Sequence, residues 1–336
     1  MPTIPADDPR LCWGGIASLE RGAGWIKPWR IPHEDQDLYS PGVSELAGRA
    51  EMASGVRLRF ASDATALTLH TEPLAEEGNF DLYANGDLVA TIDFAAGQTA
   101  TEFTNLPDGD NALELWLSQA MPVAVRAIEL PEGSTLEKCE DHRRKWVTYG
   151  SSITHCRTAG SPSFTWPGVV ARGMDFNLTS FGFGGQCHAD PMMARLIRDR
   201  PADFLSVKIG INICGGSSLG PRTFRPAIIG TIATIRDGHP DTPFAVCSPI
   251  WGHDREDAPN AVGLTLRQMR IEVQEAVESF RRRGDAHIYY VDGLKLFGED
   301  LAHLLPDNLH PNAEGYRLMG EHFLREVFEV QGVQVG

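Results

Sequence analysis

The chain has 336 residues, of which 42% are hydrophobic and 22% are charged, as in globular proteins that bury a sizeable core. This length suits two domains better than one. Acidic residues number 45 against 30 basic ones, so the net charge of −15 would repel a polyanion such as nucleic acid. The one dense basic run, Arg281-Arg282-Arg283, falls at the end of a predicted helix, where cations stabilise the last carbonyls, and does not indicate a nucleic-acid site.

Cysteine usage and the start of the chain bear on the compartment. No two of the six cysteines form a CxxC pair, so we expect reduced, mostly buried thiols rather than a disulfide framework. The first 15 residues lack the basic and apolar regions of a secretory signal, and no apolar run reaches membrane-spanning length. These features predict a cytoplasmic protein without membrane contact. The loss of a native signal stays open, as does the oligomeric state, a homo-oligomer included.

The first 140 residues have the pattern of short strands. Hydrophobic Val56, Leu58 and Phe60 alternate with arginines, which is the period of a half-buried strand. Asn85-Gly86 joins two further strand-like runs, and both residues accept the positive φ that a tight hairpin requires. No convincing amphipathic helix occurs before residue 140. Residues 1–140 are therefore predicted to form an all-β sandwich, jelly-roll-like accessory domain.

From residue 141 to 336 strands alternate with helices. The clearest helix places Leu266, Met269, Val273, Val277 and Phe280 on one face and ends before a glycine. The alternation predicts an α/β domain with a five-stranded parallel sheet covered by helices on both faces, a three-layer, flavodoxin-like arrangement. The predicted strands are 145–149, 175–181, 203–209, 243–248 and 287–291, and the predicted helices are 164–172, 191–199, 224–236, 266–280 and 314–328.

Ligands of such sheets bind at the carboxyl ends of the strands, and four fragments with chemical potential lie there or before the last helix. Ser152 follows the first predicted strand, a glycine-rich segment (181–186) follows the second and Asn212 the third. Asp307 and His310 are three residues apart, so one tight turn can bring the carboxylate to an imidazole nitrogen. Each fragment alone is common in ordinary loops, but their joint occurrence in this order is specific.

The fragments GSSIT, GFGGQ, GIN and DNLHP resemble the four blocks of the SGNH hydrolases, also called the GDSL family, over residues 145–330. The resemblance implies that Ser152 is the nucleophile, His310 its general base and Asp307 the group that orients the base. It also implies an oxyanion hole made by the backbone N–H of Ser152, the backbone N–H of Gly185 and the side-chain amide of Asn212. Such enzymes need no metal and no organic cofactor.

Three details qualify the resemblance. Ser151 stands where the family usually has an aspartate, which leaves two adjacent serines at the nucleophile position. Gly184 is the alternative oxyanion donor if the second block is shifted by one residue. The segment Phe80-Asp81-Leu82-Tyr83 is similar to the motif of the two-domain GxDLY branch, with its glycine displaced to Gly78.

That branch includes esterases of acylated carbohydrates, and similar two-domain enzymes transfer acyl groups to natural products. The sequence therefore predicts a serine esterase that hydrolyses small acyl esters, including acetylated carbohydrates, through an acyl-enzyme. The alternative is an acyltransferase that passes the acyl group to a hydroxyl. A third possibility, a catalytically silent carbohydrate-binding protein, predicts a broken triad, whereas the triad here is complete.

Other side chains at the strand ends are candidates for contact with a small-molecule substrate. His155 follows the nucleophile, His188 follows the glycine block and Trp251 follows the fourth strand. The two histidines with Cys156 and Cys187 do not match a short zinc-binding spacing, so we expect no metal there. For the tryptophans of the first 30 residues, packing is favoured over sugar binding.

Overall fold

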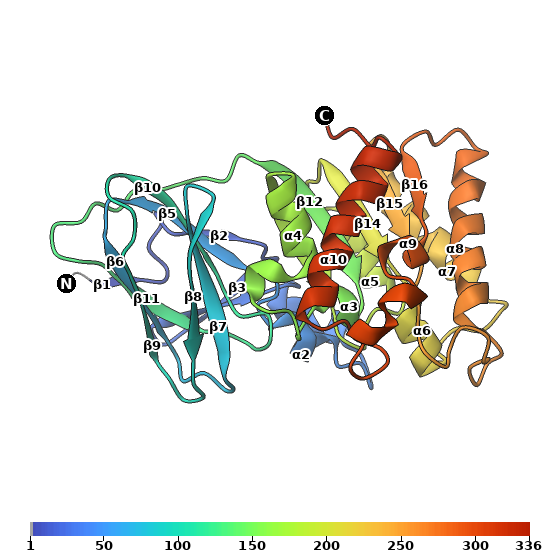
Figure 1. The fold of residues 1–336 in the computed structure, drawn as a ribbon, viewed down its shortest axis with the longest axis horizontal. Helices are drawn as coiled ribbons and strands as arrows, with labels where there is room; N and C mark the ends of the chain where they lie inside the picture. Colours follow the sequence, from blue (N-terminus) through green and yellow to red (C-terminus); the bar gives the residue numbers. More distant parts are fainter. Residues whose placement is uncertain (1–2) are drawn as a thin grey trace. The chain divides into compact units, whose positions relative to one another are not determined.

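The computed structural model describes residues 3–336, which divide into two compact units (Figure 1). The first unit contains the chain up to Arg143 together with Ser161–Ser163, and the second contains Arg144–Gly160 and Phe164–Gly336. The sequence predicts one boundary, between residues 140 and 141. In the structure, Ser161–Ser163 also groups with the first unit. The first two residues of the predicted accessory domain lie outside the described residues.

Two antiparallel sheets form the first unit, as the alternating pattern predicts. One has the strand order β3-β4-β11-β6-β9 with β1 paired to β11, and the other has the order β2-β5-β10-β7-β8. The strands are β1 (Thr3–Pro5), β2 (Cys12–Gly14), β3 (Ser18–Gly22), β4 (Trp25–Trp29), β5 (Arg57–Ser62), β6 (Ala66–Thr71), β7 (Gly78–Ala84), β8 (Asp87–Phe94), β9 (Ala100–Thr104), β10 (Asn111–Trp116) and β11 (Val125–Glu129).

The predicted hairpin at Asn85-Gly86 is confirmed. Asn85 has φ 54° and Gly86 has φ 94°, and β7 and β8 pair on either side of them. Phe80 and Phe94 on these strands pack with ring centroids 4.5 Å apart, inside the apolar core of the unit. The hairpin therefore fixes which face of β7 points into the core. Two short helices, α1 (Gln36–Tyr39) and α2 (Leu46–Ala50), and the 3-10 turn η1 (His33–Asp35) are additions that the strand pattern does not predict.

The sequence predicts that β5 is half-buried, with its arginines exposed, but the structure places these arginines in a buried or partly buried ionic cluster. The side chain of Arg57 is 1% exposed and lies with Arg59 and Arg143 around the carboxylates of Glu114 and Asp141. Burial lowers the pKa of Arg57 to about 10. Burial alone would raise the pKa of Glu114, but the three guanidinium groups outweigh it and hold that pKa below its usual value. The arginine face of β5 can therefore be buried, because acidic side chains pair with its positive charges.

The second unit is built on one parallel sheet with the strand order β13-β12-β14-β15-β16. This confirms the predicted five-stranded parallel α/β domain. The strands are β12 (Arg144–Gly150), β13 (Phe176–Gly182), β14 (Phe204–Lys208), β15 (Phe244–Cys247) and β16 (Ile288–Val291). All their carboxyl ends lie at one edge, so residues that follow β12, β13, β14 and β15 are brought together.

Helices cover both faces of this sheet: α4 and α10 lie together on one face, and α5 and α7 on the other (Figure 1). Against the first pair, Trp146 of β12 packs within 6.1 Å of the rings of Trp166, Phe176, Phe204 and Phe323. The helices are α3 (Ser152–His155), α4 (Trp166–Gly173), α5 (Pro191–Arg198), α6 (Ile211–Gly216), α7 (Phe224–Gly238), α8 (Leu266–Arg281), α9 (Gly293–Leu296) and α10 (Ala313–Phe323), with 3-10 segments η2 (Pro162–Phe164) and η3 (Glu299–Leu304) and a π-helical segment η4 (Leu324–Val330).

Helix ends follow local capping chemistry. Thr265 and Gln268 form a capping box at the start of α8, and Gly284 with φ 96° follows its end. The predicted last helix, 314–328, is observed as α10 followed by the π-helical η4. Within residues 3–336, no helix is both long and apolar enough to cross a membrane.

Candidate active site

The nucleophile candidate sits where β12 passes into the short helix α3. The residue before it, Ser151, is 1% exposed, and its hydroxyl caps the helix by accepting the N–H of Ile153 at 3.2 Å. Gly150 allows the close turn, because a Cβ there would lie 2.2 Å from the Thr154 hydroxyl. Of the two adjacent serines, Ser151 therefore caps the helix, and Ser152 is the one whose hydroxyl faces His310.

Ser152, His310 and Asp307 form a continuous relay. His310 Nε2 lies 2.8 Å from Ser152 Oγ, and His310 Nδ1 lies 2.6 Å from Asp307 Oδ2. The other carboxylate oxygen of Asp307 accepts the backbone N–H groups of Leu309 and His310 at 3.0 and 2.7 Å. Asn308 adopts φ 61° in this turn, a conformation that asparagine tolerates well.

The electrostatics of the turn keep the carboxylate charged. Burial opposes ionisation of Asp307, but hydrogen bonds from the backbone and imidazole of His310 and from Leu309 outweigh it and hold the pKa of Asp307 below its usual value. A charged Asp307 accepts the hydrogen bond of Nδ1–H, which leaves Nε2 as the imidazole nitrogen that can accept the proton of Ser152. This is the tautomer that general-base catalysis requires.

The three predicted oxyanion donors come from three strand ends. Among the described residues, no hydrogen-bond partner occupies the N–H of Ser152, the N–H of Gly185 or the amide Nδ2 of Asn212. Asn212 Oδ1 accepts the N–H of Cys187 at 3.0 Å, which fixes the amide so that Nδ2 is the free end. Gly185 has φ 75°, a conformation that favours glycine.

The geometry favours Gly185 over the alternative donor. The N–H of Gly184 donates to His155 Nδ1 at 3.3 Å and is therefore occupied. His155 is completely buried, so this side chain has no face to offer a substrate. The sequence predicts that His155 contacts substrate. In the structure its imidazole instead binds the backbone N–H of Gly184, next to Gly185.

His188 braces the same loop from the other side. Its Nε2 donates to the carbonyl of Gly185 at 2.9 Å, and its Nδ1 lies 2.7 Å from Ser218 Oγ. Asp190 accepts the backbone N–H of His188 at 3.1 Å and the hydroxyl of Tyr149 at 3.0 Å. Both nitrogens of His188 thus have partners within the unit, and substrate contact through it stays a prediction. Sequence reasoning missed Ser218 and Asp190, because residues that brace a loop follow no periodic pattern.

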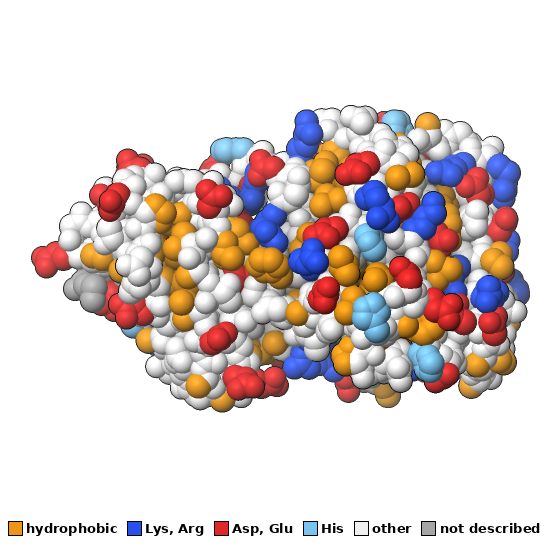
Figure 2. Space-filling model, in the orientation of Figure 1, with side chains coloured by type: hydrophobic (Ala, Val, Ile, Leu, Met, Phe, Trp, Pro, Cys, Tyr) orange, Lys and Arg blue, Asp and Glu red, His pale blue; other side chains and the backbone are white. Residues whose placement is uncertain are grey.

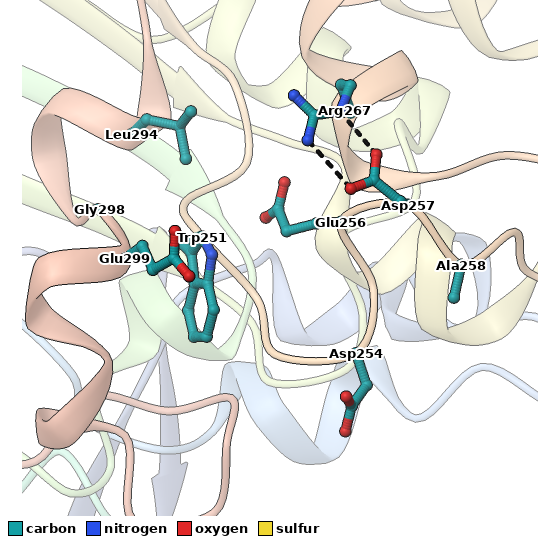
Figure 3. Close-up of a pocket in the computed structure, with 9 residues that line it drawn as sticks. All are labelled: Trp251, Asp254, Glu256, Asp257, Ala258, Arg267, Leu294, Gly298 and Glu299. Atoms are coloured by element: carbon teal, nitrogen blue, oxygen red, sulfur yellow. Dashed lines mark hydrogen bonds and ion pairs between the residues drawn. The ribbon is translucent and has the colours of Figure 1, made fainter.

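Trp251 lies farther along the same edge of the sheet. It follows β15 and lines a cavity of about 610 Å³ (Figure 3). The other lining residues are Asp254, Glu256, Asp257, Ala258, Arg267, Leu294, Gly298 and Glu299. They come from loops and helix ends that are distant in sequence, so spacing alone does not reveal the cavity.

Three buried cysteines of the second unit are poor nucleophiles. Burial raises the pKa of Cys187 and Cys247 to about 12 and that of Cys156 further still, so these thiols stay protonated. Across residues 3–336, no group of three or more His, Cys, Asp or Glu side chains is arranged to hold a metal ion.

Comparison with known proteins shows the family to which the chain belongs. The GDSL-like lipase/acylhydrolase family model matches residues 148–318, and the model of the SsfX3 N-terminal domain matches residues 11–126. The solved structure of a salicylyl-acyltransferase, SsfX3 from a tetracycline biosynthetic pathway, is 32% identical with a TM-score of 0.92 and covers 100% of this chain and 99% of its own. Curated protein sequences gave no match.

More distant structures share the fold. A GDSL-like lipase from Bacteroides ovatus is 18% identical with a TM-score of 0.79, over 99% of each chain. A family two carbohydrate esterase from Clostridium thermocellum, solved with cellohexaose, is 18% identical with a TM-score of 0.64, over 84% of this chain and 94% of that one. The resemblance read from the four sequence blocks is thereby confirmed. The chain belongs to the GDSL-like lipase/acylhydrolase family, the SGNH serine hydrolases.

Proposed function

We propose that this enzyme cleaves small acyl esters through an acyl-enzyme on Ser152. The observation that carries the proposal is the relay in which His310 Nε2 lies 2.8 Å from Ser152 Oγ and Nδ1 lies 2.6 Å from Asp307. These distances fall within hydrogen-bond reach, as a nucleophile and its base require.

In the first half-reaction, His310 takes the proton of Ser152 while Oγ attacks the carbonyl carbon of the ester. Asp307 stabilises the imidazolium that forms. The negative oxygen of the tetrahedral intermediate accepts hydrogen bonds from the backbone N–H groups of Ser152 and Gly185 and from Asn212 Nδ2. His310 then donates its proton to the leaving alcohol, and the acyl group stays on Ser152.

In the second half-reaction, His310 removes a proton from the incoming water, which attacks the acyl-enzyme through the same oxyanion hole. The carboxylic acid leaves and Ser152 recovers its proton. The substrates we propose are small acyl esters, acetylated carbohydrates among them.

The decisive test replaces the nucleophile. Ser152→Ala removes the attacking oxygen, and turnover of 4-nitrophenyl acetate should fall by about 10⁴-fold or more, since only binding and the oxyanion hole remain. Ser279→Ala, a serine on α8 whose hydroxyl bonds the Glu275 carbonyl, is the matched control and should retain wild-type turnover. A folded Ser152→Ala enzyme with most of its activity would refute the assignment.

The second candidate function is transfer of the acyl group to an alcohol. The observation that favours it is the 32% identity, over the full length, to a protein named as a salicylyl-acyltransferase. Both functions share the acyl-enzyme and differ in whether water or a hydroxyl attacks it. Product analysis with an aryl ester and rising concentrations of candidate alcohols separates them: a transferase forms the new ester in preference to the free acid.

A silent carbohydrate-binding protein is the third candidate, and the intact relay argues against it. A fluorophosphonate reacts with an activated serine, so mass spectrometry should find the label on Ser152. Absence of the label from folded protein would favour the silent binding protein.

A further inference from the structure

The cavity lined by Trp251 is large enough for a ligand and is separate from the relay. Its volume of about 610 Å³ lies within the range of about 300–1,000 Å³ that small-molecule sites occupy. It opens beside the residues that follow β15, and Ser152 follows β12, so both lie at the carboxyl edge of one sheet with β14 between their strands. Strands lie about 4.8 Å apart, which puts the two strand ends about 10 Å from each other.

One wall of the cavity is aromatic. The backbone N–H of Trp251 donates to the carbonyl of Phe297 at 3.0 Å, which fixes the main chain at this position. Glu299 and Leu294 line the same cavity as Trp251 (Figure 3). Within residues 3–336, the carboxylate of Glu299 makes no hydrogen bond or ion pair. A carboxylate acceptor without a partner therefore lines the same cavity as an aromatic side chain.

The opposite wall carries paired charges. Glu256 accepts the N–H of Gly252 at 3.1 Å and forms an ion pair with Arg270. Asp257 binds Arg267 through two hydrogen bonds of 2.7 and 3.0 Å. Figure 3 shows Glu256 projecting toward the space in front of Trp251. The wall thus offers both carboxylate acceptors and a guanidinium donor, held in place before a ligand arrives.

We propose that this cavity binds a neutral, polyhydroxylated ring of the alcohol part of the ester, that is, a sugar ring. The indole of Trp251 covers the C–H face of such a ring, Glu299 and Glu256 accept hydrogen bonds from its hydroxyls, and Arg267 donates to them. The inference rests on the proposed function, because it names the alcohol that this acyl-transfer site accepts.

Other ligand chemistries fit the walls less well. A phosphate or a carboxylate would face Glu256, Asp257 and Glu299, and an extended acyl tail would find apolar contact mainly at Trp251, Ala258 and Leu294. Since neither the triad nor the predicted oxyanion donors line this cavity, we assign it to a ring next to the one that carries the acyl group. The ligand is therefore an oligosaccharide or a glycoside with at least two rings.

The test compares esters that differ in the number of rings. Monoacetylated mono-, di- and trisaccharides of the cello, malto and xylo series are measured beside 4-nitrophenyl acetate. In at least one series kcat/KM should rise with ring number. Trp251→Ala should reduce kcat/KM for the trisaccharide ester about tenfold more than for 4-nitrophenyl acetate, mainly through KM, because the stacking surface is lost.

Two further variants sharpen the result. Trp251→Phe keeps an aromatic face and should recover most of the loss, which separates stacking from misfolding. Trp25→Ala, which removes a half-buried tryptophan of β4 in the first unit, should affect all esters equally. The proposal is overturned if no series gains from added rings, or if Trp251→Ala lowers every substrate by the same factor.

Binding without turnover distinguishes this inference from the proposed function. Calorimetry with cellotriose, maltotriose and xylotriose on Ser152→Ala should detect binding of at least one sugar, and the Ser152→Ala/Trp251→Ala double variant should lose it. If wild type neither turns over esters nor reacts with a fluorophosphonate while this sugar binding persists, the cavity assignment stands and the esterase assignment fails. Active enzyme with no sugar binding supports the esterase assignment and overturns the cavity assignment.

Discussion

Ser151, which precedes the proposed nucleophile, illustrates how a residue type can change while its local function is kept. The SGNH resemblance leads us to expect an aspartate at position 151, and Ser151 accepts the N–H of Ile153 in its place. Serine and aspartate are both good helix N-caps, so the start of α3 keeps its geometry. Ser152 is consequently held in the same turn, with His310 at hydrogen-bond distance.

The order and spacing of motifs in the sequence predicted Ser152, His310 and Asp307, but not the residues that hold the neighbouring loops in place. Asp307 and His310 share one turn, so their spacing of three predicts their contact, and the strand pattern places Ser152 at the same edge of the sheet. Nothing in the spacing predicts that His155 takes the N–H of Gly184 or that Ser218 meets His188. Those contacts depend on how loops fold back, which side-chain periodicity does not encode.

Substitution of Gly185 tests the proposed oxyanion hole, because it changes the backbone conformation without removing the N–H. Gly185→Ala meets no steric obstacle, but φ 75° costs an alanine about 1–2 kcal/mol, and relief of that strain would turn the N–H away. We expect kcat to fall about 10²-fold, as for the loss of one oxyanion donor. Gly284→Ala is matched, with φ 96° and an equally open Cβ position, and should lose similar stability in thermal unfolding but no kcat. Equal activity of the two variants would exclude Gly185 as a donor.

His155 tests whether the loop beside Gly185 must be held. His155→Leu leaves the partly buried N–H of Gly184 without an acceptor, so the backbone beside Gly185 loses its anchor and kcat should fall about tenfold with little change in KM. His155→Asn supplies an acceptor oxygen near the position of Nδ1 and should restore most of the rate. Separate measurement of kcat and KM for both variants decides this, and an Asn variant as slow as the Leu variant would contradict a role in positioning.

At the scale of elements, the period of two in short strands predicted the sandwich of the first unit, and the alternation of strands with helices predicted the parallel sheet of the second, because burial repeats with the period of each element. The hairpin at Asn85-Gly86 and the amphipathic α8 are the clearest cases. Short elements such as α6 and η3 were not predicted, since a few residues contain too little periodicity. The cavity walls were missed for the same reason: Glu256, Arg267 and Glu299 lie in loops or at the starts of helices.

The ionic cluster on β5 and β10 was also beyond sequence reasoning. Arginines at alternate positions of a strand normally indicate a solvated face, whereas here Arg57 is buried beside Glu114. The two strands are paired in the structure, with Glu114 opposite Arg59. Only this register shows that the charges neutralise one another.

Glu114 makes the stability of the first unit depend on pH. Its pKa is lowered in the folded state, so the stability it contributes is complete above its unfolded pKa of about 4.5 and is lost as pH falls through the folded value. Glu114→Gln leaves buried guanidinium groups without their counter-charge and should destabilise the unit by about 3–5 kcal/mol at pH 7. Urea unfolding at pH 7 and pH 3 should show the difference from wild type shrinking at the lower pH.

Glu102→Gln is the control for that experiment, because Glu102 is exposed on β9 and belongs to no ion pair among the described residues. Its unfolding free energy should match wild type within about 0.5 kcal/mol at both pH values. A Glu114→Gln protein as stable as Glu102→Gln at pH 7 would show that the cluster contributes nothing.

At the scale of the whole molecule, the net charge is −15. Arg281 and Arg282, from the densest basic run, pair with Glu278 and Glu275 on the same helix. In the face that Figure 2 presents, basic and acidic side chains are interspersed rather than gathered in blocks of one sign. A substrate approaching the enzyme therefore meets mainly the excess of carboxylates.

The excess of negative charge predicts for which substrates kcat/KM rises with salt concentration. An ester with a negative charge is repelled at low ionic strength, and the repulsion weakens as the screening length falls from about 30 Å at 0.01 M salt to about 8 Å at 0.15 M. The value of kcat/KM for the mono-4-nitrophenyl ester of succinic acid should therefore rise several-fold over this range, while that for neutral 4-nitrophenyl acetate stays constant. A parallel rise for both would point to a salt effect on the enzyme itself. A fall for the anionic ester would reveal a local cation at the site that outweighs the net charge, and the two measurements together separate these cases.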